Sequence, residues 1–296
     1  MSTIFAVPRS IARRILPPRA VAAVQILFKR QFITYSRPYD SWAAAKRDAT
    51  GYDDPAILQA VRKSASAVKE GRAAFEYGSL AYEEIAFRWP LLACLLHVAL
   101  QRYPLSGRPL HILDFGGSLG SVYFQHRMFL ERLPSLFWSI VEQPHFVQCG
   151  NAEFADERLR YFGTISEASA RAPIECAIFS GSLEYLDMPY DVLAQIAALG
   201  STYLILDRMH ISNARDDQIM VQTVKRPGWG ATLAIRYLAR QKLLVHLDSI
   251  GYEVMATLPN GLFCERKRDR QKEADRVNKA DAPIHSCEAG EGEACS

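Results

Sequence analysis

The segment from residue 110 to residue 120 constrains the fold of this chain more than any other. An apolar run, 110–113, is followed by Asp114 and then by a turn that contains Gly116, Gly117 and Gly120. The run is too short for a helix and is typical of a buried parallel strand, while the glycines allow a tight turn and close approach of a ligand to the backbone. Apolar residues resume at Val122, which predicts a helix. This order of strand, glycine turn and helix begins a doubly wound α/β domain that binds a nucleotide-type cofactor.

Short apolar runs alternate with longer mixed segments through the rest of the chain, as expected for repeated βα units around a parallel sheet. The predicted strands are 110–114, 137–142, 159–163, 174–180, 201–207, 252–257 and 261–265. Helices fit between most of them, including 192–199 and 237–249. The last two strands are separated by three residues, too few for a crossover helix, which predicts an antiparallel hairpin. We therefore expect an α/β fold: a Rossmann-like, seven-stranded, mostly parallel sheet with a C-terminal antiparallel hairpin.

The sequence before and after this domain has a different character. Helix signals at 41–46, 56–69 and 91–100 predict a helical N-terminal region over residues 38–105, ahead of the Rossmann-like domain at 106–265. Residues 266–296 are charged and poor in apolar side chains, which predicts a disordered tail. Residues 1–37 form a basic amphipathic segment that contains no acidic residue.

Two readings of the segment 1–37 remain open. Its apolar stretch, 20–28, is short and ends in Lys29-Arg30 instead of a small-residue cleavage site, which argues against a signal peptide. No apolar run approaches the roughly 20 residues that span a bilayer. We favour a partly ordered tail or a helix against the domain over weak, reversible contact with an anionic membrane surface. A cytoplasmic location is expected in both cases.

Charge and cysteine usage exclude several classes of function. The formal net charge is +3, and the excess of basic residues lies at one end instead of along a continuous face, so nucleic-acid binding has little support. The six cysteines are scattered and contain no C-x-x-C pair. We therefore expect reduced thiols in the cytoplasm, with neither a disulfide framework nor a metal site.

Two acidic residues stand at successive strand ends, Asp114 and Glu142. An acid at the end of the second strand of such a fold accepts hydrogen bonds from ribose hydroxyls, which makes an adenosine site credible. The G-x-G-x-x-G fingerprint of dinucleotide binding is incomplete, no tyrosine is followed four residues later by lysine, and no Gly-Lys pair forms a phosphate loop. One rival survives, because Gly116-x-Ser118-x-Gly120 satisfies the G-x-S-x-G pattern of serine hydrolases.

The segment Asp114-x-Gly116-x-Ser118-x-Gly120 resembles the D-x-G-x-G-x-G loop of class I S-adenosylmethionine-dependent methyltransferases, with serine at the middle glycine. More specifically, residues 113–120 and 138–144 resemble an uncharacterised methyltransferase family with a D-F-G-G-x-L-G loop and a V-E-Q-P strand end. The likeness spans about residues 38–260. Some members of that family accompany surface-polysaccharide genes, but its substrate is not established.

The resemblance implies S-adenosylmethionine as the cofactor. By this resemblance Gly116, Gly117, Ser118 and Gly120 pass its methionine end, and Glu142 holds its ribose. Asp114 faces the ligand or orients the loop through backbone N–H groups. Ser118 suits its position in the loop if its φ is negative, whereas a positive φ there would bring a steric penalty from the Ser118 Cβ.

Methyl transfer from a sulfonium is an in-line displacement that depends mainly on alignment, with a base needed for some acceptors. The acceptor should lie beyond the strand ends. His210 is our first candidate for the base and Asp207 the second, while Glu184, Tyr185 and Arg208 are candidates for contact with the substrate. The structural alternatives are a solvent-facing histidine, an Asp207–Arg208 ion pair and a solvated helix-start acid at Glu184.

Three hypotheses follow for the function. The first is a cytoplasmic S-adenosylmethionine-dependent methyltransferase that acts on a small-molecule or glycan-related acceptor, through a hydroxyl. The second is a non-catalytic module that binds an adenosine ligand or a partner on the same fold. The third is a serine hydrolase that uses Ser118, which should react with a fluorophosphonate probe.

Overall fold

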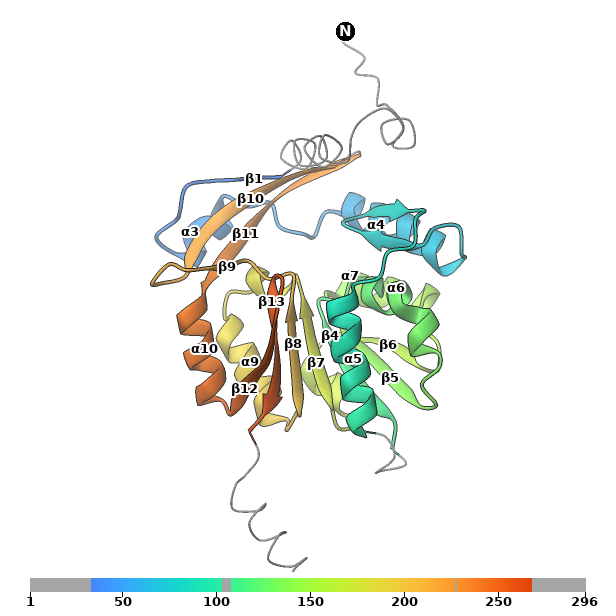
Figure 1. Ribbon diagram of the computed structural model, residues 1–296. Coiled ribbons are helices and arrows are strands. Elements are labelled where there is room, and N and C mark those ends of the chain that lie inside the picture. Colours follow the sequence, from blue (N-terminus) through green and yellow to red (C-terminus); the bar gives the residue numbers. More distant parts are fainter. Residues whose placement is uncertain (1–32, 103–107, 227, 268–296) are drawn as a thin grey trace, which may run out of the picture.

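The computed structural model describes residues 33–102, 108–226 and 228–267, and its main feature is a seven-stranded sheet (Figure 1). The strand order is β12-β13-β8-β7-β4-β5-β6, and β13 runs in the opposite direction to the other six strands. The strands are β4 (Leu110–Phe115), β5 (Leu136–Val141), β6 (Leu159–Phe162), β7 (Cys176–Ser180), β8 (Tyr203–Asp207), β12 (Tyr252–Leu258) and β13 (Gly261–Arg266). The predicted fold class, with its C-terminal hairpin, is therefore confirmed.

Helices cover both faces of this sheet because its central strands are apolar on both faces. Adjacent residues of β4 belong to different cores: Ile112 packs with α4–α7, whereas Leu113 packs with α8–α10. The covering helices are α5 (Trp89–Arg102), α6 (Ser121–Leu130), α7 (Pro144–Glu153), α8 (Ile165–Ser169), α9 (Pro189–Ala198) and α10 (Arg240–Ser249). Chain order reverses between β4 and β7, so the crevice for a ligand lies at the carboxyl ends of these two strands.

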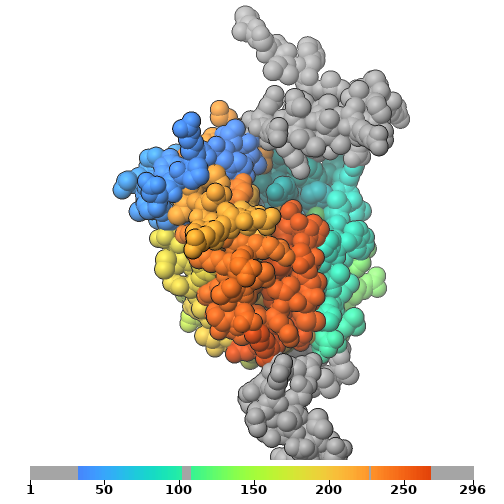
Figure 2. Space-filling model, turned by 60° about the vertical axis from the view of Figure 1, so that its left-hand side comes forward, coloured from blue at the N-terminus to red at the C-terminus, as the bar shows by residue number. Residues whose placement is uncertain are grey.

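A second sheet, which the sequence did not predict, lies above the carboxyl ends of the parallel strands (Figure 1). Its order is β1 (Ile33–Tyr35), β10 (Gln218–Arg226), β11 (Trp229–Ala239) and β9 (Ile211–Ser212). The predicted helix 237–249 was wrong at its start, because Tyr237 pairs with Gln218 and the helix begins at Arg240. In the space-filling view, residues from the start of the described chain lie against this sheet (Figure 2).

The helical N-terminal region is also confirmed, with one addition. Helix α3 (Trp42–Arg47) is capped by the Ser41 hydroxyl, and α4 (Pro55–Lys69) by the Asp54 carboxylate. Between α4 and α5 lies an unpredicted hairpin, β2 (Phe75–Tyr77) and β3 (Leu80–Tyr82). Its turn places Gly78 and Ser79 at positive φ, 57° and 64°, which matches the twist of paired strands.

The basic segment 1–37 and the predicted disordered tail lie mostly outside the described residues, and the domain boundaries stay predictions. Of the basic segment, residues 33–35 are described as β1, which pairs with β10. None of the helices in the described residues has the length and apolar character that a membrane span requires.

Candidate functional site

The glycine turn after β4 packs so tightly that side chains do not fit at two of its positions. A Cβ on Gly116, where φ is +69°, would lie 2.5 Å from the Ser182 Cβ. A Cβ on Gly117 would lie 2.6 Å from the Asp114 Oδ2. Ser118 has a φ of 56°, so the steric penalty for a side chain in the left-handed region applies to it. Packing inside the protein therefore requires glycine at both positions, and strain is stored at Ser118.

Asp114 lies beneath this turn and is fully buried. Its Oδ2 accepts a hydrogen bond from the Trp138 Nε1 at 3.3 Å, while its Oδ1 has no partner in the described part of the chain. Burial raises the pKa of Asp114 to about 7. The carboxyl group therefore fills the space under Gly117, and its contact with the cofactor stays a prediction.

Glu142 follows β5 and joins that strand end to the turn. Its Oε1 accepts the Ser118 N–H at 3.0 Å, and its Oε2 accepts the Gln143 N–H at 2.9 Å. Burial raises the pKa of Glu142, whereas these two N–H groups lower it. Each carboxylate oxygen has a second lone pair, so the group can also accept ribose hydroxyls. The structure thus brings two of the predicted cofactor residues into contact.

His210, the predicted base, forms a hydrogen-bonded cluster with Glu184. The His210 Nδ1 lies 2.9 Å from the Glu184 Oε1, and the His210 Nε2 lies 3.2 Å from the Tyr35 hydroxyl. Glu184 is fully buried, and its Oε2 has no partner among the described residues. Tyr185 joins the same cluster through Gln222, which contacts the hydroxyls of both Tyr185 and Tyr35 at 3.0 Å. Glu184 therefore contacts the histidine and is not a solvated acid.

Asp207 and Arg208, at the end of β8, meet a third residue that the sequence did not indicate. Arg88 forms an ion pair with Asp207 and donates from its Nη1 to the Ser180 Oγ at 2.9 Å. The Arg208 Nε lies 3.9 Å from the Asp207 Oδ2. Because Arg88 precedes α5 and belongs to no motif, its place at this strand end could not be predicted. Asp207 is engaged in these pairs, which leaves His210 as the better-placed base.

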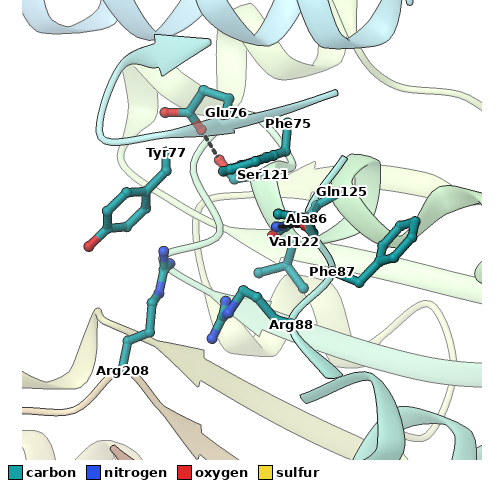
Figure 3. A pocket seen from close by; sticks show the side chains of 10 residues that line it. All are labelled: Phe75, Glu76, Tyr77, Ala86, Phe87, Arg88, Ser121, Val122, Gln125 and Arg208. Carbon is teal, nitrogen blue, oxygen red and sulfur yellow. Dashed lines mark hydrogen bonds between the residues drawn. The ribbon is translucent and has the colours of Figure 1, made fainter. Parts of the chain in front are cut away.

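A cavity of about 250 Å³ opens beside these arginines, against the first turns of α6 (Figure 3). Its lining includes Glu76 and Tyr77 from the β2–β3 hairpin, Ser121 from α6, Arg88 and Arg208. The buried Glu76 carboxylate accepts hydrogen bonds from the Ser121 hydroxyl and from the Ser79 N–H, the latter at 2.7 Å. The predicted cofactor residues do not line this cavity. The hairpin residues were missed because the hairpin itself was not predicted.

The described residues offer little support for the rival chemistries. Ser118 has the strained backbone that a hydrolase nucleophile can share, but its hydroxyl makes no hydrogen bond to any described histidine. Within residues 33–102, 108–226 and 228–267, no group of three His, Cys, Asp or Glu could hold a metal ion. Cys94, Cys149, Cys176 and Cys264 are free thiols.

Comparison with known proteins gives structural similarity alone. No family model matches the chain, and no curated protein matches it. The N-terminal domain of EvdMO1, crystallised in the presence of SAH and D-fucose, is 17% identical, with a TM-score of 0.41 over 70% of this chain and 97% of that one. CalS10, an amino pentose methyltransferase from Micromonospora echinaspora, is 12% identical, with a TM-score of 0.39 over 63% of this chain and 100% of that one. An S-adenosylmethionine-dependent methyltransferase from Clostridium acetobutylicum is 7% identical, with a TM-score of 0.42 over 62% of this chain and 93% of that one. Similarity at this level assigns neither a family nor an activity to the chain.

Proposed function

We propose that this chain is an S-adenosylmethionine-dependent methyltransferase that acts on a hydroxyl of a small-molecule or glycan-related acceptor. The observation that carries the proposal is the Glu142 carboxylate, which ends β5 and contacts the glycine turn at the point where strand order reverses. A carboxylate at this position is suited to ribose hydroxyls. The turn is held tightly at this place, because a Cβ on Gly116 or Gly117 would collide with Ser182 or Asp114.

The residues of the turn have separate parts in this proposal. When bound, S-adenosylmethionine supplies an electrophilic methyl group on a sulfonium. Glu142 accepts the ribose hydroxyls, and the backbone of Gly116, Gly117, Ser118 and Gly120 lies along the methionine end. Asp114 supports the turn from below, where its protonated form avoids a buried charge.

His210 serves as the general base for the acceptor. Its Nδ1–H donates to Glu184, which leaves the Nε2 lone pair available for a proton. The acceptor hydroxyl replaces the Tyr35 hydroxyl at Nε2 and transfers its proton there, and the buried Glu184 carboxylate stabilises the resulting imidazolium. The cluster adjoins the glycine turn, because Ser182, two residues before Glu184, donates to the Phe115 carbonyl at 2.6 Å. Tyr185 holds the cluster through Gln222, and Asp207 fixes the two neighbouring arginines.

Transfer of a labelled methyl group from S-adenosylmethionine into fractions of a cell extract, followed by identification of the product, tests this function. The variant His210→Gln should lower the rate by roughly 10²–10⁴-fold while cofactor binding is retained. The control His246→Gln changes a histidine that bonds the Tyr190 carbonyl instead. Cofactor binding without transfer to any fraction would favour the non-catalytic module.

The cytoplasmic location is a proposal, and weak membrane contact through residues 1–37 is the alternative to a partly ordered tail or a helix against the domain. Co-sedimentation with anionic liposomes should be measured for the full chain and for a chain that lacks residues 1–36. Binding that is lost on deletion supports membrane contact, and no binding by the full chain contradicts it.

A further inference from the structure

Two guanidinium groups converge on a single hydroxyl at the wall of the cavity. The Arg88 Nη1 donates to the Ser180 Oγ at 2.9 Å, and the Arg208 Nε donates to the same oxygen at 3.2 Å. Figure 3 shows both groups directed toward the same part of the cavity, with Tyr77 beside Arg208. The Arg208 guanidinium lies 4.8 Å from the centre of the Tyr77 ring, which holds it in place. Like charges are thus held close together by their surroundings.

The backbone on both sides fixes this arrangement. The Arg88 N–H donates to the Nε2 of the fully buried His126 at 3.2 Å. Arg208 has a φ of 56° and donates from its Nη2 to the Ser180 carbonyl at 2.9 Å. Two independent segments, before α5 and after β8, are therefore held so that their arginines meet at the end of β7.

The acids near this pair leave part of its charge without a direct partner. Asp207 contacts both arginines: it forms an ion pair with Arg88, and the Arg208 Nε lies 3.9 Å from its Oδ2. Glu76 lines the cavity, but its oxygens accept from Ser79 and Ser121, and burial raises its pKa. Burial also raises the pKa of Asp114, to about 7. Burial and the neighbouring Arg208 together lower the pKa of Arg88 to about 9. Among the described residues, Asp207 is thus the one carboxylate that pairs directly with these two guanidinium groups.

We propose that Arg88 and Arg208 form a subsite for an oxyanion, a phosphate or a carboxylate, carried by the methyl acceptor. The inference rests on the proposed function and names the chemical class of its substrate. In the described part of the chain, neither the Arg88 Nε nor the Arg208 Nη1 donates a hydrogen bond, so donors are available to the anion. Guanidinium groups bind such oxyanions through paired N–H donors. The acceptor is favoured over the cofactor as the source of the anion because neither Glu142 nor the glycine turn lines this cavity.

Calorimetric titration of inorganic phosphate, and separately of acetate, into the protein saturated with S-adenosylhomocysteine tests the subsite. Saturation supplies the cofactor's own carboxylate, so any further anion must bind elsewhere. At least one anion should bind, and Arg88→Gln and Arg208→Gln should each weaken it tenfold or more without a change in S-adenosylhomocysteine affinity. The variant Arg88→Lys, which keeps the positive charge, should lose less of the affinity for the anion than Arg88→Gln does. The control Arg215→Gln, at an exposed arginine, should bind as the wild type does.

The remaining outcomes overturn either the inference or the proposed function, in distinguishable ways. If the glutamine variants weaken S-adenosylhomocysteine and the saturated protein binds neither anion, the arginines hold the cofactor. If both anions bind the variants as tightly as they bind the wild type, the arginines are structural. If the folded wild type does not bind S-adenosylhomocysteine, the proposed function fails, and phosphate and acetate titrated into the free protein still test the arginine pair. Circular dichroism of each variant establishes that it is folded.

Discussion

Replacement of Gly116 by alanine tests the packing of the glycine turn most sharply. The positive φ of 69° costs an L-residue roughly 1–2 kcal/mol. The added Cβ would lie 2.5 Å from the Ser182 Cβ. Overpacking of this kind costs about a further 1–3 kcal/mol of stability. We therefore expect Gly116→Ala to lower the free energy of unfolding by roughly 2–5 kcal/mol.

Gly200→Ala is the matched control. Gly200 has a φ of +81°, yet a Cβ there would meet nothing within 4 Å, so the backbone penalty of roughly 1–2 kcal/mol remains without the clash. The loss of unfolded-chain entropy is the same for both substitutions and cancels in the comparison. Urea denaturation followed by circular dichroism measures both free energies. Equal losses in the two variants would refute the contact between the turn and Ser182.

Three further predictions concern the strain, protonation and charge of the site. Ser118→Gly relieves the left-handed strain and should raise the free energy of unfolding by about 0.5–1 kcal/mol in the same assay; a loss of stability would contradict the strain. Because burial raises the pKa of Asp114 from 3.8 to about 7, the stability it contributes is complete below pH 4 and is lost as pH rises through 7. The free energy of unfolding of Asp114→Asn, relative to that of the wild type, should therefore increase between pH 4 and pH 7. A difference in free energy that does not change with pH would count against the raised pKa of Asp114. Glu184→Gln removes the charge that positions His210, so kcat should fall at least about tenfold at unchanged cofactor affinity; wild-type kcat across the pH range would make Glu184 merely structural.

The seven strands could be predicted because each is a short segment of four to seven residues, mostly apolar, that is separated from the next by turn residues or a helix. The contact between Glu142 and the glycine turn follows from the same reasoning, since the ends of adjacent parallel strands share one edge of the sheet. His210 and Glu184 were both candidates, but their pairing depends on how the chain turns after β7 and β8. Local sequence does not encode that geometry.

The second sheet could not be predicted because its strands mix polar and apolar residues without clear alternation. Strand β10 carries Gln222 and Thr223 beside the buried Val221 and Val224, and β1 comes from the far end of the described chain. The residues that this sheet and the β2–β3 hairpin bring to the site, Tyr35 and Glu76, were missed for the same reason. Asp114 was expected to face the ligand or orient the loop through backbone N–H groups; its Oδ2 accepts from the Trp138 side chain, and its contact with the ligand stays a prediction.

Calorimetric titration of S-adenosylmethionine into the folded protein tests the proposed cofactor site most directly. We predict saturable binding at one site, weakened at least about tenfold by Glu142→Ala, because a hydrogen-bonded charged group contributes roughly 1.5–3 kcal/mol. The control Glu131→Ala changes an exposed glutamate paired with Arg127 and should leave the affinity unchanged. No binding by the folded wild type, or equal affinity in the Glu142 variant, would contradict the assignment.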